Sequence, residues 1–195
     1  QGPYGDLLWG CRDCPQSAST LRSCGHRFCN QCQNQSTEQW LERQRQKQLP
    51  VHYYMVTFTL PYELRGLART HRKTVYGLLM RHAVETLRTF AKNDPSMGSV
   101  LGLCAVLHTH TRRLDYHPHV HIVVPGGALD RTRRQWRKVQ GRYLFNGRAL
   151  AAAFRGAFLK ALHDAGLGVH ITPKRWVAHC ERVGRGQEAL QYLAR

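Results

Sequence analysis

Alternating apolar side chains predict three β-strands in the middle of the chain. Successive side chains of a strand point to opposite faces, so apolar residues of one parity form one buried face. Residues 51–60, 100–111 and 116–125 each contain such a row. The rows are Tyr54, Val56, Phe58 and Leu60, then Leu101, Leu103, Ala105 and Leu107, then Val120, Ile122 and Val124. The short connection between the second and third strands predicts an antiparallel hairpin, and residues 175–180 suggest a further short strand.

Helical spacing alternates with these strands. Residues 70–93 and 148–165 repeat apolar side chains every three or four positions, as an amphipathic helix does. Residues 187–195 contain no helix breaker and predict the first turns of another helix. A polar helix is expected at 36–48, with Ser36 and Gln39 as a capping box. This order predicts an α+β fold, an antiparallel sheet with helices against one face, spanning residues 51–195.

Cysteines set the beginning of the chain apart. Five of the seven fall between residues 11 and 32, in two Cys-x-x-Cys pairs around a Cys-x-His. Two such pairs supply four thiolates to a tetrahedral zinc. The simplest ligands are Cys11, Cys14, Cys29 and Cys32, with Cys24 and His26 as alternatives. So short a segment buries little apolar surface, so we expect residues 1–48 to form a zinc-binding domain that folds with its metal, followed by a connector helix.

The charge balance points to a polyanionic partner. Lys and Arg number 29 against 12 Asp and Glu, which gives a formal charge of +17. An excess this large indicates nucleic acid, because it would otherwise only repel itself; a generally basic protein is the alternative. Neither a membrane span nor a signal peptide is visible, so a cytoplasmic, DNA-associated protein is expected. The chain starts without methionine and stops inside a predicted helix, which suggests a fragment.

A basic and aromatic segment follows the third strand. Positive charge interleaved with aromatic rings suits single-stranded nucleic acid, where cations follow phosphates and rings stack on bases. The candidate DNA-binding residues are Arg131, Arg133, Arg134, Trp136, Arg137, Lys138 and Arg142. A solvated basic loop is the alternative interpretation.

Two histidines of the third strand are candidate metal ligands. His119 and His121 share one face, opposite the apolar row, and two neutral imidazoles at this spacing can hold a divalent ion. His117 has the same parity, but Pro118 marks the start of the strand and leaves His117 at the edge of the site. His108 or His110 can face the metal from the neighbouring strand. The alternative is a pair of histidines on a solvated face.

The chain resembles a known family in most of its length. A hairpin bearing His-hydrophobic-His, followed by a helix, a strand and a helix carrying a tyrosine, is the element order of the HUH endonucleases, with their ferredoxin-like palm. More closely, the chain resembles the two-tyrosine rolling-circle transposases of bacterial insertion sequences, relatives of the Helitrons. The matching segments are residues 29–33, 56–61, 107–109, 117–121, 125–127, 176–177 and 192–195.

The resemblance implies a chemistry for these residues. Tyr192 would be the nucleophile, and His119 and His121 would hold Mg²⁺ or Mn²⁺, with His108 and Glu188 as candidates for the third ligand. The product would be a 5′-phosphotyrosine link with a free 3′-hydroxyl, and the activity would be nicking and rejoining single-stranded DNA at element ends. The family's second tyrosine would lie just past Arg195.

Two other functions fit the same sequence. A replication initiator or a relaxase uses the same HUH chemistry, whereas a zinc-knuckle module with an inert catalytic unit would only bind DNA. This chain also departs from the family pattern at Arg112 and Arg113, and its knuckle histidine is shifted to His26.

Overall fold

The computed structural model describes residues 5–22, 30–97, 100–111, 113–139, 144–169 and 171–194. Contacts divide the chain into two compact units. The first comprises Gln1–Gln48 with Ala194–Arg195, and the second comprises Leu49–Leu193.

The first unit holds a small antiparallel hairpin and a helix. Strands β1 (Asp6–Gly10) and β2 (Ser17–Leu21) pair, and α1 (Asn30–Arg45) follows. Leu8 is 80% exposed and Trp9 is 59% exposed. None of the side chains whose burial the structure describes between residues 5 and 48 is buried. These side chains therefore form no apolar core that would stabilise the hairpin without a metal.

The predicted start of the connector helix is wrong. Helix α1 begins at Asn30, six positions before Ser36. The hydroxyl of Ser36 donates to the carbonyl of Gln33 at 3.0 Å from inside the helix, so Ser36 does not form the predicted capping box.

The second unit is built on a four-stranded antiparallel sheet in the order β4-β5-β3-β8. The strands are β3 (Tyr53–Thr59), β4 (Cys104–His110), β5 (Tyr116–Pro125) and β8 (Ala178–Arg182). The predicted hairpin is confirmed, with Leu107 opposite Val120 and His108 opposite His119. The last strand starts three residues later than predicted, because Trp176 packs against Phe154 and Phe158 instead of joining the sheet.

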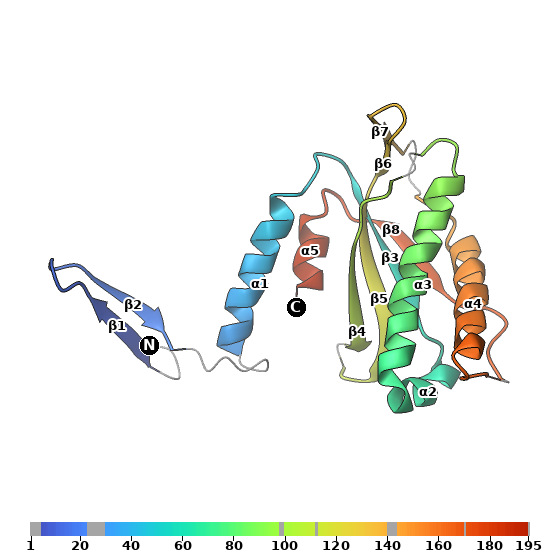
Figure 1. The fold of residues 1–195 in the computed structure, drawn as a ribbon, viewed down its shortest axis with the longest axis horizontal. Coiled ribbons are helices and arrows are strands. Elements are labelled where there is room, and N and C mark those ends of the chain that lie inside the picture. The colour runs from blue at the N-terminus through green and yellow to red at the C-terminus, as the bar shows by residue number, and fades with distance from the viewer. Residues whose placement is uncertain are drawn as a thin grey trace. The chain divides into compact units, whose positions relative to one another are not determined.

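Two long helices cover one face of this sheet (Figure 1). They are α3 (Arg72–Asn93) and α4 (Gly147–Asp164), and the short η1 (Tyr62–Leu64) and α2 (Arg65–Thr70) lie between β3 and α3. The apolar rows of β3 and β5 are buried beneath them. The rings of Phe58 and Phe154 pack in a tilted arrangement with their centroids 4.8 Å apart. The predicted α+β class, with helices on one face, is confirmed.

The short helix α5 (Gln187–Leu193) lies on the opposite face of the sheet (Figure 1). Ala189, Leu190 and Leu193 are its buried residues. Gly186 lies directly before α5, has a φ of 84°, and is so close to Tyr53 that a Cβ at this position would come within 2.6 Å of the Tyr53 ring. A larger residue at Gly186 would therefore be strained and would displace α5 from the sheet.

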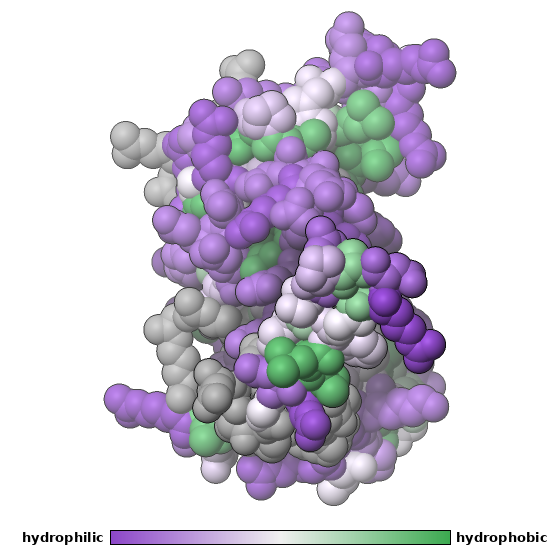
Figure 2. Space-filling view, turned by 90° about the vertical axis from the view of Figure 1, so that its left-hand side faces the viewer, coloured by the Kyte–Doolittle hydropathy of each residue, from purple (hydrophilic) through white to green (hydrophobic). Residues whose placement is uncertain are grey.

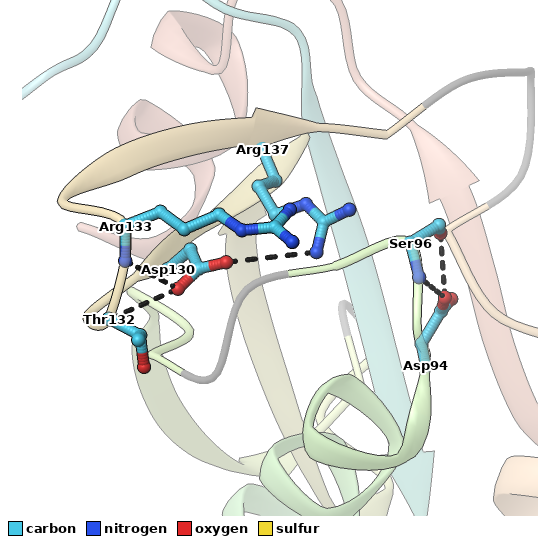
Figure 3. A network of polar contacts seen from close by, with 6 residues as sticks. All are labelled: Asp94, Ser96, Asp130, Thr132, Arg133 and Arg137. Atoms are coloured by element: carbon cyan, nitrogen blue, oxygen red, sulfur yellow. Dashed lines mark hydrogen bonds and ion pairs between the residues drawn. The ribbon is translucent and has the colours of Figure 1, made fainter.

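A second hairpin follows β5 where only a basic segment was expected. It consists of β6 (Gly127–Asp130) and β7 (Gln135–Lys138). Figure 3 shows how Asp130 holds its turn: the carboxylate accepts hydrogen bonds from the backbone amides of Thr132 and Arg133 at 3.1 Å each. The same carboxylate lies 3.7 Å from the guanidinium of Arg137.

One face of the chain is largely polar (Figure 2). Hydrophilic residues dominate the face seen in Figure 2, and hydrophobic residues form only separate patches there. Among the described helices, none has both the length and the apolar character required to cross a bilayer.

Replacement of Phe154 tests the packing of α4 on the sheet. Phe154→Ala removes a side chain that is 1% exposed and contacts both Phe58 and Trp176. We expect a loss of about 3–5 kcal/mol in unfolding free energy, from lost burial and the cavity left behind. Denaturant unfolding followed by far-UV circular dichroism, with zinc present, measures it. Phe154→Leu keeps most of the volume, and an equal loss for both variants would contradict the cavity argument.

Candidate metal and tyrosine site

Three histidines meet on the sheet face that carries α5. His108 of β4 lies opposite His119 of β5, and His121 is two residues further along β5. One ring nitrogen from each lies within 4.8 Å of the others. His119 is 8% exposed and His121 is 7% exposed. The strand register thus brings together three imidazoles. The sequence had predicted His119 and His121 as a pair, with His108 or His110 as a further candidate.

The hydrogen bonding of His119 fixes which nitrogen is free. Its Nδ1 lies 2.5 Å from the carbonyl oxygen of His117. A carbonyl only accepts, so Nδ1 carries the hydrogen and donates it. In the neutral ring, Nε2 then keeps its lone pair, which is the arrangement found in metal-binding histidines.

His121 has an equivalent arrangement. Its Nδ1 lies 2.9 Å from the hydroxyl of Thr57 on the neighbouring strand β3. Its Nε2 is buried and, among the described residues, has no hydrogen-bond partner. When Nδ1 donates to Thr57, the unpaired Nε2 is a buried lone pair that a metal ion would satisfy. This donor set therefore fits a divalent ion.

Burial keeps the three rings neutral. It lowers the pKa of His108 and of His119 below the usual histidine value. For His121, burial together with the neighbouring His119 and His108 lowers the pKa to about 4. Burial disfavours the charged form, and a neutral imidazole is the form that binds metal.

Tyr192 lies beside this group. Helix α5 places its ring centroid 5.2 Å from that of His121 and 5.9 Å from that of His108. The hydroxyl-bearing side chain of Tyr192 is thus next to a candidate metal centre whose three histidines lie 71 to 84 residues earlier in the sequence. Glu188, the other predicted candidate for third ligand, is exposed in the first turn of α5 and is not part of the group.

His117 lies at the edge of the site, as its position next to Pro118 predicts. Its ring centroid is 5.3 Å from that of His119, but it is not one of the three grouped histidines. Its Nδ1 accepts a hydrogen bond from the guanidinium of Arg65 in α2. Burial, and then the charge of Arg65, lower the pKa of His117.

The predicted zinc ligands are only partly described. Cys11 and Cys14 lie in the turn between β1 and β2, and Cys32 lies in α1, whereas Cys24, His26 and Cys29 fall outside the described residues. The sulfur of Cys11 accepts a hydrogen bond from the amide of Asp13 at 3.5 Å. Donation from Asp13 and Cys14 lowers the pKa of the Cys11 thiol, which favours the thiolate that zinc binds.

The predicted DNA-binding residues form part of the β6–β7 hairpin. Arg131, Arg133 and Arg134 are exposed in its turn, Lys138 is exposed at the end of β7, and Arg142 lies outside the described residues. Arg137 is paired with Asp130, and Trp136 is half-buried, packed so closely on Gly127 that a Cβ there would come within 2.6 Å. The exposed arginines remain available, whereas Arg137 and Trp136 also stabilise the hairpin.

Sequence reasoning missed two residues that orient the site. Thr57 has the parity opposite to the apolar row of β3, and only the register with β5 shows that it faces His121. Arg65 lies 52 positions from His117, in the short helix α2, which was not predicted and which precedes the helix expected at residues 70–93.

Comparisons with known proteins agree for both parts of the chain. Residues 1–60 match the model of the "Transposase zinc-binding domain" (Zn_Tnp_IS91), and residues 102–195 match the Y2_Tnp model, "Putative transposase". The "Putative transposase y4qJ" of Sinorhizobium fredii is 39% identical over 83% of this chain and 40% of its own length. The transposase of insertion sequence element IS801 from Pseudomonas savastanoi is 33% identical over 62% of this chain and 28% of its own.

The chain therefore spans less than half the length of these two relatives. A solved structure of TrwC with a 27-mer DNA comprising the recognition hairpin and the cleavage site is 17% identical, with a TM-score of 0.48 over 62% of this chain and 47% of that one. The two family models match successive parts of the chain, with the zinc-binding domain first. Both parts of the chain are thus similar to IS91-type insertion-sequence transposases, which confirms the resemblance seen in the sequence.

Proposed function

We propose that this chain carries the DNA-nicking and DNA-joining centre of a rolling-circle transposase, with Tyr192 as the nucleophile. One observation carries the proposal: the Tyr192 ring lies 5.2 Å from that of His121, beside three grouped imidazoles. A nucleophile and a candidate metal centre on adjacent elements are the two parts that attack on a phosphodiester requires.

The proposed step breaks one ester bond and forms another. The Tyr192 oxygen attacks the phosphorus of a single-stranded DNA phosphodiester and loses its proton to the surrounding water. The bond from phosphorus to the 3′-oxygen breaks, and that oxygen takes up a proton as a free 3′-hydroxyl. The 5′-phosphate stays on the tyrosine, and attack by a 3′-hydroxyl reverses the step and rejoins DNA. Ester exchange conserves the bond, so no energy source is needed.

His108, His119 and His121 would hold the catalytic divalent ion. Bound there, the ion would polarise the scissile phosphate and stabilise the charge that builds on its oxygens. The protein's part is to hold the three rings neutral and oriented, through the carbonyl of His117 and the hydroxyl of Thr57. Mg²⁺ prefers oxygen ligands, so Mn²⁺ is the better fit of the two predicted ions.

The first unit would bind a structural zinc through Cys11, Cys14, Cys29 and Cys32, with Cys24 and His26 as the alternatives. The match of residues 1–60 to a zinc-binding domain supports this. The amide bonded to the Cys11 sulfur, and the lack of buried side chains among the described residues of this unit, support it too.

The partner would be single-stranded DNA at the ends of the element and at its target, in the bacterial cytoplasm. The charge of +17 and the exposed arginines of the β6–β7 turn support binding to phosphates. A relaxase or replication initiator would use the same chemistry. A purely DNA-binding module is the alternative of another class, which the formation of a covalent adduct would exclude.

Tyr192→Phe tests the nucleophile. The ring remains, and its packing beside His121 with it, but the attacking oxygen is gone. We expect no covalent adduct with an oligonucleotide from the end of the element in the presence of Mn²⁺, on a denaturing gel. Tyr76→Phe is the matched control, since its hydroxyl bonds only that of Tyr116 at 2.7 Å among the described contacts. An adduct that survives in Tyr192→Phe would sink the assignment.

His119→Ala tests the metal group. Removal of one of three ligands should weaken Mn²⁺ binding by at least about tenfold, measured by calorimetric titration of zinc-saturated protein. His163→Ala, on the exposed side of α4, should leave it unchanged. Equal affinities in the parent chain and in His119→Ala would rule out this site.

The pH dependence of Mn²⁺ binding tests the neutral rings. Protons compete with the metal only below the pKa of the free ligands. Three ordinary imidazoles, each half-protonated near pH 6.5, would lose about eightfold in affinity between pH 8 and 6.5. Here the pKa values are lowered, that of His121 to about 4, so we expect a clearly smaller loss, with the fall displaced toward lower pH. A loss of eightfold or more by calorimetry would contradict it.

A further inference from the structure

A short path of contacts leads from the candidate metal group to the surface. The ring of His117 lies 5.3 Å from that of His119, between ring centroids. The guanidinium of Arg65 donates to Nδ1 of His117. The same guanidinium lies over the ring of Tyr62, 5.2 Å from its centroid. The four residues come from β5, α2 and η1, and all belong to the second unit.

Among the residues that the structure describes, no carboxylate forms an ion pair with Arg65. The residue is half-buried, and its Nε is fully buried with no hydrogen-bond partner among the described residues. A partly buried guanidinium without an anion is costly, because burial removes solvation that nothing replaces. An anionic ligand at this point would compensate it.

His117 presents a hydrogen-bond donor at the same point. A guanidinium has only donors, so Nδ1 of His117 must accept from Arg65. The ring hydrogen of His117 therefore lies on Nε2. Arg65 and His117 together offer donors suited to phosphate oxygens, next to His119 of the metal group.

Tyr62 provides an aromatic face. It is 77% exposed, and the Arg65 guanidinium lies over its ring, 5.2 Å from the centroid. An exposed ring next to phosphate-binding donors is the arrangement by which proteins hold single-stranded nucleic acid, since every base has a face that stacks.

We propose that Tyr62, Arg65 and His117 form a nucleotide-positioning subsite beside the metal group. It takes the nucleotide adjacent to the scissile phosphate. Arg65 and the Nε2 hydrogen of His117 bind the backbone phosphate of that nucleotide, and its base stacks on Tyr62. The subsite rests on the proposed function and adds to it the residues that place the strand. It is tolerant of base identity, because stacking and phosphate contacts carry no sequence code.

Tyr62 variants test the stacking. The probe is a fluorescent oligo-dT 15-mer, bound without chelator and without added Mn²⁺ or Mg²⁺ to protein that carries one equivalent of zinc, and read by anisotropy. We expect Tyr62→Ala to weaken binding roughly 5- to 100-fold and Tyr62→Phe, which keeps the ring, to stay within about twofold of the parent chain. Equal binding by the parent chain and Tyr62→Ala, or equal losses in both variants, would overturn the stacking role.

Arg65 variants test the phosphate contact. We expect Arg65→Gln to weaken binding and to reduce the slope of log affinity against log salt by about one, whereas Arg65→Lys keeps most of the slope. Arg88→Gln, an exposed cation of α3, is the matched control. The Mn²⁺ affinity should be the same in Arg65→Gln, Arg65→Lys and Arg88→Gln. A variant that disrupted the neighbouring metal group would instead lose Mn²⁺ affinity. An unchanged salt slope in Arg65→Gln would overturn this role.

Adduct formation separates this subsite from the proposed function. If the parent chain forms the adduct and the Tyr62 and Arg65 variants bind and react as it does, the subsite fails and the function stands. If the parent chain forms no adduct while the binding losses appear as expected, the function fails and the subsite stands as a single-strand binding site.

Discussion

The register between β4 and β5 is the constraint on which the rest of the second unit depends. It sets His108 opposite His119, and the alternation of β5 then sends His121 to the same face and Val120 and Ile122 to the other. A slip of one residue would place imidazoles in the core beneath α3 and apolar side chains beside α5. The packing of the core and the assembly of the histidine group are thus one requirement, because the same strand satisfies both.

The two faces of the sheet have different physical tasks. The face under α3 and α4 is closed by large apolar side chains and stabilises the fold. The other face shields three imidazoles beside α5, which favours their neutral form. Burial here tunes the proton affinity of the rings rather than adding stability, and the hydrogen bonds to the Thr57 hydroxyl and to the His117 carbonyl orient them.

Local pattern predicted much of this arrangement. Period-two rows located β3, β4 and β5, and helical spacing located α3 and α4, because each of these elements buries one continuous apolar face. The start of β8 was misplaced because Trp176 is buried by packing on Phe154. An apolar residue buried in this way looks the same in the sequence as one buried in a strand. The hairpin β6–β7 was missed because the many charged residues of this segment were interpreted as a basic loop. Thr57 and Arg65 act on histidines more than fifty positions away, so only the assembled register reveals them.

The absence of buried side chains among the described residues of the first unit has a thermodynamic consequence for the whole chain. One unit owes its stability to a hydrophobic core, whereas the other would owe it to metal coordination, so the two respond to different variables. The apparent stability of the first would rise with the logarithm of free zinc, and that of the second would not. A single free energy of unfolding is therefore not a property of this molecule. Chelation of that zinc would leave a chain with a folded second unit and an unfolded N-terminal segment.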